Sequence, residues 1–323
     1  MTHGRRWELV SNKLAVASMM AMLAGGMLTG TAGAADEPSK TMEHGGPAAP
    51  ADPNTGALSI SAGVDAVSEY WFRGIPQQDQ GVILQPYATI TASLWSNDEF
   101  SLSAFVGIWN SVHSEHPGVT GGWYEADWIF GASVGLPAGF TLTPSFIIYH
   151  SPNGAWVETQ EMDLTLAYND SPLWGETGIP GWAGLQPYAT LAFETAGGAD
   201  SLGKTGDLGT YVELGITPAF TLIQSKDYPV TLKFPLKVGL SIDSYYEYTD
   251  VSSGSTENPT FGYFDGGIMA YVPLAFIPAQ FGSWDLHGGV HFIVLNSDYI
   301  DNTLGSDYDE LRIVGTVGIG MTY

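Results

Sequence analysis

The C-terminal stretch LRIVGTVGIGMTY, residues 311–323, alternates apolar residues with polar or small ones. Leu311, Ile313 and Val317 fall on one side of the alternation, and Arg312 and Thr316 fall on the other. Because successive side chains of a β-strand point to opposite faces, the pattern predicts a strand with one apolar and one polar face. Such a strand suits a wall between hydrocarbon and water.

The same alternation recurs through the chain, for example in LQPYATI (84–90) and its near copy LQPYATL (185–191). After the N-terminal segment, no apolar run approaches the roughly 18–20 residues of a membrane-spanning helix. We therefore predict an all-β fold, a transmembrane antiparallel β-barrel of about 12 strands. The expected strands lie near 57–72, 82–95, 99–110, 123–136, 139–150, 157–169, 183–195, 208–222, 229–248, 261–276, 284–295 and 310–323.

The connections between these strands alternate in length, as in bacterial outer-membrane barrels with long outer loops and short inner turns. The segment 169–184 is the exception, because it is long for an inner turn. Several prolines interrupt the expected strands and cannot donate to a ladder, so we expect them at bulges or near a rim. They are Pro86, Pro144, Pro187, Pro218, Pro235 and Pro273.

Aromatic residues gather near the ends of the expected strands, which predicts two belts at the membrane interfaces. Core aromatics of a soluble β protein are the alternative. The residues are Trp71, Trp95, Trp109, Trp123, Tyr124, Tyr149, Trp156, Tyr168, Tyr245, Tyr246, Tyr248 and Trp284.

The N-terminal segment has basic residues, an apolar run over 14–28 and the small-residue site Ala32-Gly33-Ala34. This arrangement predicts a secretory signal peptide over residues 1–34. Residues 35–56 are rich in Pro, Ala and Gly and predict a flexible leader, so the barrel itself is expected over 57–323. The chain has no cysteine, which excludes a disulfide framework and a thiol-linked lipid anchor.

The net charge of −24 argues against nucleic acid as a partner, because its phosphates are also negative. We expect acids to outnumber bases on the water-facing side of the strands, which indicates a cation-preferring interior. Ion pairs that plug the lumen would use the same residues. The pore-lining candidates are Asp65, Glu69, Arg73, Gln85, Tyr87, Glu125, Asp127, Glu161, Asp163, Glu213, Lys233, Lys237, Asp265 and Arg312.

The stretch SEYWFRGIPQQ (68–78) resembles the TorF-like family of bacterial outer-membrane porins, which has a Tyr-x-Phe-Arg-Gly-Ile-x-Gln pattern. The matching residues here are Tyr70, Phe72, Arg73, Gly74, Ile75 and Gln77. A second stretch, FIIYHSPNGAWVETQEMDLTLAYND (146–170), is similar to the family's aromatic turn and the acidic strand after it. The resemblance implies an outer-membrane barrel.

Neither catalysis nor a metal site is expected. His150 and Ser151 invite comparison with outer-membrane lipid hydrolases, but adjacent residues of a strand point to opposite faces. His287 and His291 share a face yet lie about 13 Å apart, too far for one metal ion. No cofactor is expected either.

An acidic run precedes the last strand, at Asp298, Asp301, Asp307, Asp309 and Glu310. Three interpretations stay open for it. The run could bind divalent cations that tie the loop to lipopolysaccharide, it could form a cation-attracting vestibule, or it could be a solvated loop.

The function expected from these patterns is passive diffusion of ions or small polar solutes through a narrow channel in the outer membrane of a Gram-negative bacterium. A barrel of twelve strands lies between filled barrels of about eight and open porins of 16–18. The expected partners are outer-membrane lipid, lipopolysaccharide and the assembly machinery that reads the final strand ending at Tyr323. The alternatives are a plugged structural or interaction barrel, a lipid hydrolase and a secreted soluble sandwich or lectin.

Overall fold

The computed structural model describes residues 56–115, 120–175, 177–197, 208–226, 228–250, 252–303 and 309–323. The predicted signal peptide and, apart from Gly56, the predicted leader lie outside these residues. Among the described residues, no helix combines the length and the apolar character needed to cross a membrane.

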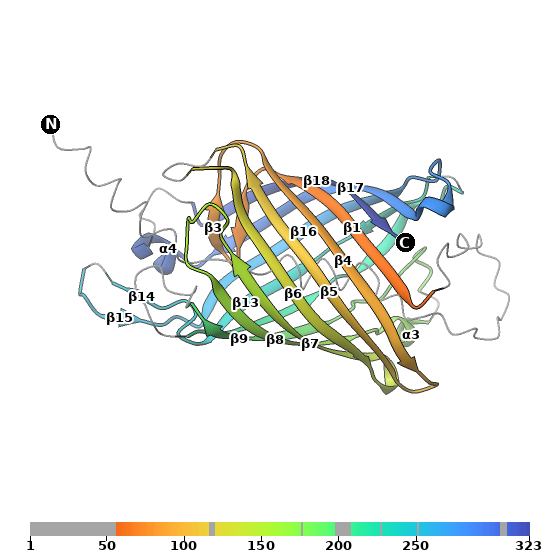
Figure 1. Cartoon of the computed structure of the whole chain (residues 1–323), viewed down its shortest axis with the longest axis horizontal. Coiled ribbons are helices and arrows are strands. Elements are labelled where there is room, and N and C mark those ends of the chain that lie inside the picture. Colours follow the sequence, from red (N-terminus) through yellow and green to blue (C-terminus); the bar gives the residue numbers. More distant parts are fainter. Residues whose placement is uncertain are drawn as a thin grey trace.

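The described chain forms a closed barrel of 12 antiparallel wall strands (Figure 1). The strands are β1 (Leu58–Val67), β4 (Ile83–Ser96), β5 (Ser101–His113), β6 (Trp123–Gly135), β7 (Phe140–His150), β8 (Thr159–Tyr168), β9 (Tyr188–Ala196), β10 (Thr210–Ile216) continued by β11 (Ala219–Ile223), β12 (Val230–Lys233) continued by β13 (Leu236–Asp243), β16 (Phe261–Pro273), β17 (Ser283–Leu295) and β18 (Leu311–Thr322). Because β18 pairs with both β1 and β17, and β16 joins β17 to β12 and β13, the wall closes on itself. The predicted fold class is confirmed.

Apolar side chains cover the outside of this wall. On β18, Leu311, Ile313 and Val317 are 51%, 56% and 55% exposed, whereas the Arg312 side chain between them is only 19% exposed. Outward apolar residues recur on the other strands, including Phe130, Leu164 and Ile268. The wall therefore has the apolar-out, polar-in alternation of a membrane barrel.

The prolines interrupt the hydrogen-bond ladder without shifting its register. Pro144 lies inside β7 and pairs with Leu164 of β8 in an unshifted register, so the expectation of a bulge or rim is wrong there. Between β12 and β13, the Pro235 carbonyl still accepts the Gly267 N–H at 2.7 Å. A missing donor is tolerated because the neighbouring bonds hold the register.

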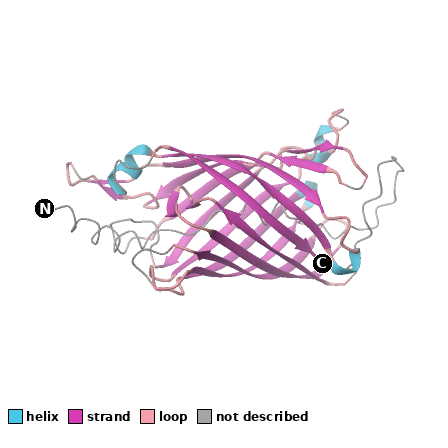
Figure 2. Cartoon of the chain, turned by 90° about the horizontal axis from the view of Figure 1, so that it is seen from above, coloured by secondary structure: helices cyan, strands magenta, loops and turns pink. Residues whose placement is uncertain are grey.

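The two ends of the barrel differ. The long-loop end has the small hairpin of β14 (Tyr248–Thr249) and β15 (Thr256–Glu257), together with the helix α4 (Ser297–Thr303) (Figure 1). The opposite, short-turn end has both chain ends of the wall, the 3₁₀ turns η2 (Pro137–Gly139) and η3 (Ala279–Phe281), and the short helix α3 (Ser171–Trp174). In Figure 2 the helical segments lie only at these ends, so the wall between them consists of strands.

The long connection 169–187 at the short-turn end has its own internal structure. The Asp170 carboxylate accepts hydrogen bonds from the Trp174 indole at 2.8 Å and from the backbone N–H groups of Leu185 and Gln186 at 3.0 and 2.9 Å. One buried carboxylate thus ties the start of the connection to its end.

Two predicted strands end five residues earlier than expected. The first strand stops at Val67 instead of 72, because the chain then turns inward and forms a separate hairpin of β2 (Tyr70–Phe72) and β3 (Ile75–Gln78). The ninth stops at Asp243 instead of 248, after which Tyr245 and Tyr246 turn inward, each 1% exposed.

The belt prediction is wrong for six of the aromatic residues. Their exposed fractions of 1–8% place them inside, and they are Trp71, Trp109, Tyr149, Tyr245, Tyr246 and Tyr248. Trp95 and Trp123, at 55% and 52%, do lie on the outer surface near strand ends. The interior of the barrel thus takes up aromatic residues that a simple membrane wall would place at its rims.

Candidate functional site

The hairpin β2–β3 leaves the wall just after β1. The last wall contacts are made by Ser68, whose N–H donates to the Gly315 carbonyl and whose hydroxyl accepts the Gly315 N–H, both at 2.9 Å. The turn of the hairpin consists of Arg73 and Gly74, with φ of 45° and 79°. Two positive φ values in a two-residue loop correspond to a type I′ turn, whose twist suits a tight hairpin.

This hairpin lies inside the lumen. Glu69, at its base, forms an ion pair with Arg312 of β18 at 2.9 Å, and Arg73, at its tip, forms one with Glu161 of β8 at 2.9 Å. In the wall order, β18 and β8 stand six strands apart in either direction, on opposite sides of the barrel. A segment that bonds to both must cross the interior.

The side chains of the hairpin fill the long-loop half of the lumen. Phe72 and Ile75 are 1% and 0% exposed, and the Tyr70 hydroxyl donates to both carboxylate oxygens of Glu125 on β6 at 3.1 Å. A side chain on Gly74 would meet the Tyr263 ring, so the turn needs glycine for close approach as well as for φ.

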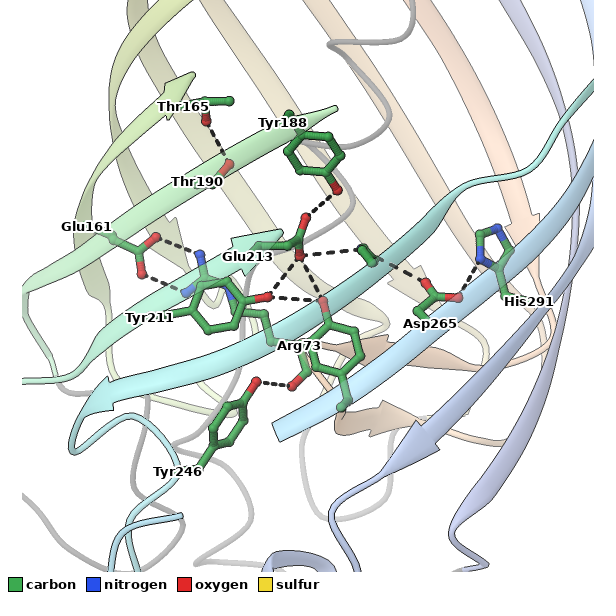
Figure 3. Close-up of polar contacts among 12 residues, drawn as sticks. Arg73, Glu161, Thr165, Tyr188, Thr190, Tyr211, Glu213, Tyr246, Asp265 and His291 are labelled. Carbon is green, nitrogen blue, oxygen red and sulfur yellow. Dashed lines mark hydrogen bonds and ion pairs between the residues drawn. The ribbon is translucent and has the colours of Figure 1, made fainter. Parts of the chain in front are cut away.

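Arg73 is enclosed at the tip (Figure 3). Its two terminal nitrogens donate to the two oxygens of Glu161 at 3.0 and 2.9 Å, and its guanidinium carbon lies 3.8 Å from the centre of the Tyr211 ring. Tyr245 lies 5.1 Å away, and the Tyr246 hydroxyl donates to the Arg73 carbonyl at 2.8 Å. The bidentate pair fixes the position and the plane of the guanidinium, and the nearby Tyr211 ring adds a cation–π contact.

A second network is centred on Glu213 of β10 (Figure 3). Its carboxylate accepts the hydroxyls of Tyr188, Tyr211 and Tyr263 at 2.7, 2.8 and 2.8 Å. Lys237 lies 3.7 Å from this carboxylate. Three phenolic donors and one cation therefore stabilise a carboxylate that is only 2% exposed.

The network continues along the wall. The Lys237 ammonium also lies 4.0 Å from Asp265, whose carboxylate is 2.9 Å from Nδ1 of His291.

The base of the hairpin is held separately, since the Arg312 guanidinium also lies over Trp71 at 5.3 Å. The hairpin is thus pinned at its tip, middle and base.

Two pairs of neighbouring carboxyl groups lie beside the hairpin, one on β6 and one on β8. Glu125 and Asp127 are 1% and 3% exposed, and Glu161 and Asp163 are 2% and 8% exposed. Each pair occupies positions i and i+2 of one strand, so both members point inward. Oδ1 of Asp127 and Oδ1 of Asp163 are buried without a hydrogen-bond partner among the described residues, so the acidic wall is incompletely compensated.

The short-turn half contains a second cluster. His287 of β17 bridges Asp65 through Nε2 at 2.7 Å and Asp285 through Nδ1 at 2.8 Å. A side chain on Gly318 would collide with the Asp65 carboxylate, so this glycine makes room for the contact across β18. His287 also stacks on Tyr271 with ring centres 5.3 Å apart. His287 and His291, which are predicted to share one face of a strand, therefore each have a carboxylate partner.

All the predicted lining residues lie on the inner side of the barrel. Glu69 and Arg73 belong to the inner hairpin and its base, and the others point inward from wall strands. For example, Lys233 Nζ lies 4.3 Å from the centre of the Tyr271 ring, and Tyr87 pairs with Gly63. They are Asp65, Glu69, Arg73, Gln85, Tyr87, Glu125, Asp127, Glu161, Asp163, Glu213, Lys233, Lys237, Asp265 and Arg312. The hairpin contacts Glu125, Glu161 and Arg312 on three different wall strands, whereas Asp65 and Lys233 belong to the short-turn half.

The sequence prediction missed the tyrosines around Arg73 and Glu213. Tyr211 and Tyr263 stand two residues from Glu213 and Asp265 on the same strands, so the alternation already placed them on the inner face. Tyr245 and Tyr246 follow the end of β13, and no local pattern indicates that they turn inward.

His150 and Ser151, the residues compared with a hydrolase pair, interact with different neighbours. The Ser151 hydroxyl donates to the Tyr124 carbonyl at 3.1 Å and accepts the Ala155 N–H at 3.0 Å, which stabilises the turn. Nδ1 of His150 lies 3.5 Å from Glu158, and its side chain is 51% exposed. These contacts place His150 and Ser151 at the turn that follows β7.

Among the described residues, no group of three or more His, Cys, Asp or Glu side chains has the arrangement to hold a metal ion. Of the acidic run, Asp298 and Asp301 belong to α4, and Asp309 and Glu310 are exposed before β18. Asp307 lies outside the described residues.

No family model matches the chain, and no curated protein matches it. The resemblance to the TorF-like family therefore stays a prediction. Solved structures that are similar to the chain include the COG4313 outer membrane channel from Pseudomonas putida F1, with a TM-score of 0.47 and 8% identity over 85% of this chain and 100% of that one.

The NanC porin has a TM-score of 0.36 and 10% identity over 82% of this chain and 99% of its own. LpxR from Salmonella typhimurium has a TM-score of 0.38 and 9% identity over 81% and 99%. These likenesses are distant, and the description of the barrel rests on the strand pairing of the chain itself.

Proposed function

We propose that this porin-like barrel is a narrow, cation-preferring channel for the passive diffusion of ions or small polar solutes. The proposal involves no chemical reaction and no cofactor. The observation that supports it is the charge of the inner face, where acidic side chains outnumber basic ones. The acids are Asp65, Glu69, Glu125, Asp127, Glu161, Asp163, Glu213 and Asp265, and the bases are Arg73, Lys233, Lys237 and Arg312.

An acidic wall inside a low-dielectric barrel raises the local concentration of cations and lowers that of anions. The hairpin β2–β3 narrows the long-loop half, because its side chains reach both sides of the wall. Permeation along this half therefore requires the hairpin to shift, whereas the ion pairs described in the short-turn half join residues of the wall strands.

The test is single-channel conductance of the refolded protein in a planar bilayer, with the reversal potential recorded under a salt gradient. We expect discrete steps and a cation-favouring reversal potential. The double variant Glu125→Gln/Asp127→Asn should shift that potential towards zero. Glu257→Gln, on the exposed hairpin β14–β15, is the matched control and should leave it unchanged. An anion-favouring potential in the unmodified protein would contradict the proposal.

A plugged structural or interaction barrel is the second candidate, and the burial of Phe72 and Ile75 favours it. The two candidates differ in the behaviour of a variant in which residues 69–80 are replaced by a short Gly/Ser linker. A channel conducts with the hairpin present and conducts more without it. A plugged barrel is silent until the hairpin is removed.

We further propose that the protein resides in the outer membrane of a Gram-negative bacterium, after export through the signal peptide and assembly through β18. The exposed acids of the long-loop end would meet lipopolysaccharide through divalent cations. Fractionation of cells that express the full chain tests the location, and recovery in the soluble periplasm would contradict it.

A further inference from the structure

The groups around Arg73 recognise the shape of a guanidinium as well as its charge. Two parallel N–H···O bonds to Glu161, at 3.0 and 2.9 Å, match the fork of the guanidinium to the fork of the carboxylate. The guanidinium carbon lies over the Tyr211 ring, 3.8 Å from its centre, and 5.1 Å from the centre of the Tyr245 ring. An ammonium cannot match the planar fork of these two bonds. We call Glu161, Tyr211 and Tyr245 the guanidinium cage.

The turn that presents Arg73 does not itself require arginine. At φ of 45° in the first position of a type I′ turn, asparagine, aspartate or glycine is the residue that the backbone favours. The arginine is therefore explained by its side chain and by the cage that receives it. The cage, in turn, is built from β8, β10 and the segment after β13, all distant in sequence from the hairpin.

The cage also has unused hydrogen-bonding capacity next to it. Oδ1 of Asp163 and the hydroxyl of Tyr149 are buried without hydrogen-bond partners among the described residues. Asp163 is 8% exposed and Tyr149 1%, and both interact electrostatically with Glu161 and Arg73. A bound molecule with further N–H donors would have acceptors here that Arg73 does not use.

We infer that the cage is a binding site for a guanidinium group, that Arg73 is its resident occupant, and that solutes bearing a guanidinium group compete for it. Displacement of Arg73 frees the tip of the hairpin, so the solute that binds also loosens the constriction. The consequence for permeation rests on the channel function proposed above, whereas the binding site does not.

Because Arg73 is attached to the cage through the hairpin, it occupies the cage in the absence of solute. A group attached through a short segment has an effective concentration in the millimolar range, so a free ligand must exceed that level to compete. In the unmodified protein, binding of a free guanidinium compound should therefore be at least tenfold weaker than in a protein without Arg73.

The experiment uses Arg73→Asn, because asparagine suits the turn while removing the guanidinium. Calorimetry of the folded, detergent-solubilised variant compares n-butylguanidinium with n-pentylammonium, two monovalent cations of similar length. We expect at least tenfold tighter binding of n-butylguanidinium, loss of that preference in Arg73→Asn/Glu161→Gln, and weaker binding to the unmodified protein. Equal affinity for the two cations, or a preference that survives the loss of Glu161, overturns the inference.

Arg73→Lys is the second variant, in case the asparagine variant does not fold. It keeps a cation on the turn but lacks the fork, so n-butylguanidinium should displace it more readily than it displaces Arg73. Conductance recorded in parallel separates the two proposals. Guanidinium-selective binding with silent bilayers would contradict the channel but keep the cage, whereas conducting bilayers without selective binding would contradict the cage alone.

Discussion

Glu69 and Arg312, which are 243 residues apart, join the base of the inner hairpin to the last wall strand through three hydrogen bonds of 2.9–3.1 Å. The pair is partly accessible, with side-chain exposures of 17% and 19%. It lies at the point where the chain leaves the wall, so it sets the direction in which the hairpin enters the lumen.

Breaking this pair should loosen the hairpin without unfolding the barrel. For Glu69→Gln we expect a loss of stability of about 1 kcal/mol, since a partly exposed pair contributes little, together with more frequent opening events in bilayer recordings. Glu99→Gln, on an exposed short turn, is the control. Unchanged gating in the Glu69 variant would show that the tip contacts alone hold the hairpin.

Gly74→Ala should prevent the hairpin from seating. The added methyl group would lie 2.7 Å from Cβ of Tyr263 and would sit at φ of 79°. Backbone strain and overpacking together should cost roughly 2–4 kcal/mol. Urea unfolding in detergent measures the loss.

Gly154→Ala is the matched control for this change, because its φ is 71° and nothing lies within 4 Å of the added atom. It should cost about 1 kcal/mol from strain alone. Equal losses for the two variants would mean that the contact with Tyr263 does not constrain the turn.

A charge on the outer face of β18 should destabilise the inserted barrel. Val317 is 55% exposed and lies near the middle of the strand. Val317→Lys should cost about 2–4 kcal/mol if that position is at the bilayer midplane. Folding titrations in lipid vesicles measure this value, with Thr316→Lys on the inner face as the control. Similar costs for both variants would contradict the assignment of the two faces.

Asp170 should make the connection 169–187 sensitive to acid. Burial alone would raise the pKa of Asp170, but hydrogen bonds from Gln186, Trp174 and Leu185 outweigh it and hold the pKa below its ordinary value. A depressed folded pKa means that the stabilisation is present above the unfolded pKa of about 3.9 and is lost as pH falls through the folded value.

For Asp170→Asn we therefore expect lower stability than the unmodified protein at neutral pH, by about 1–2 kcal/mol. The two proteins should converge as the pH falls below about 4. Thermal unfolding monitored by tryptophan fluorescence across that range provides the measurement. A constant difference at all pH values would contradict the role of the ionised carboxylate.

The wall of the barrel could be predicted from the sequence because its signal is local. Each strand shows its two faces within about ten residues, and the fixed alternation then places Glu213, Lys237 or Arg312 on the inner side without any knowledge of their neighbours. The predicted inner residues follow from that single rule.

The inner hairpin could not be predicted in the same way. Tyr70 to Phe72 continue the β-rich composition of the first strand, and Arg73-Gly74 is not one of the dipeptides that usually mark a tight hairpin. The chain is held inward by the contact of Arg73 with Glu161, 88 residues later, and by the contact of Glu69 with Arg312, 243 residues later. Long-range contacts of this kind leave no local pattern.

The position of the hairpin has a consequence for the order of assembly. The hairpin directly follows β1, the first wall strand, yet its final contacts are made with Tyr263 on β16 and Arg312 on β18, the strand that also closes the barrel against β1. The hairpin must therefore wait for its final contacts until the last strands arrive, and it is enclosed by the same step that seals the wall. Formation of the Glu69–Arg312 pair thus coincides with closure, and a probe at that pair would report when an inserting chain becomes a finished barrel.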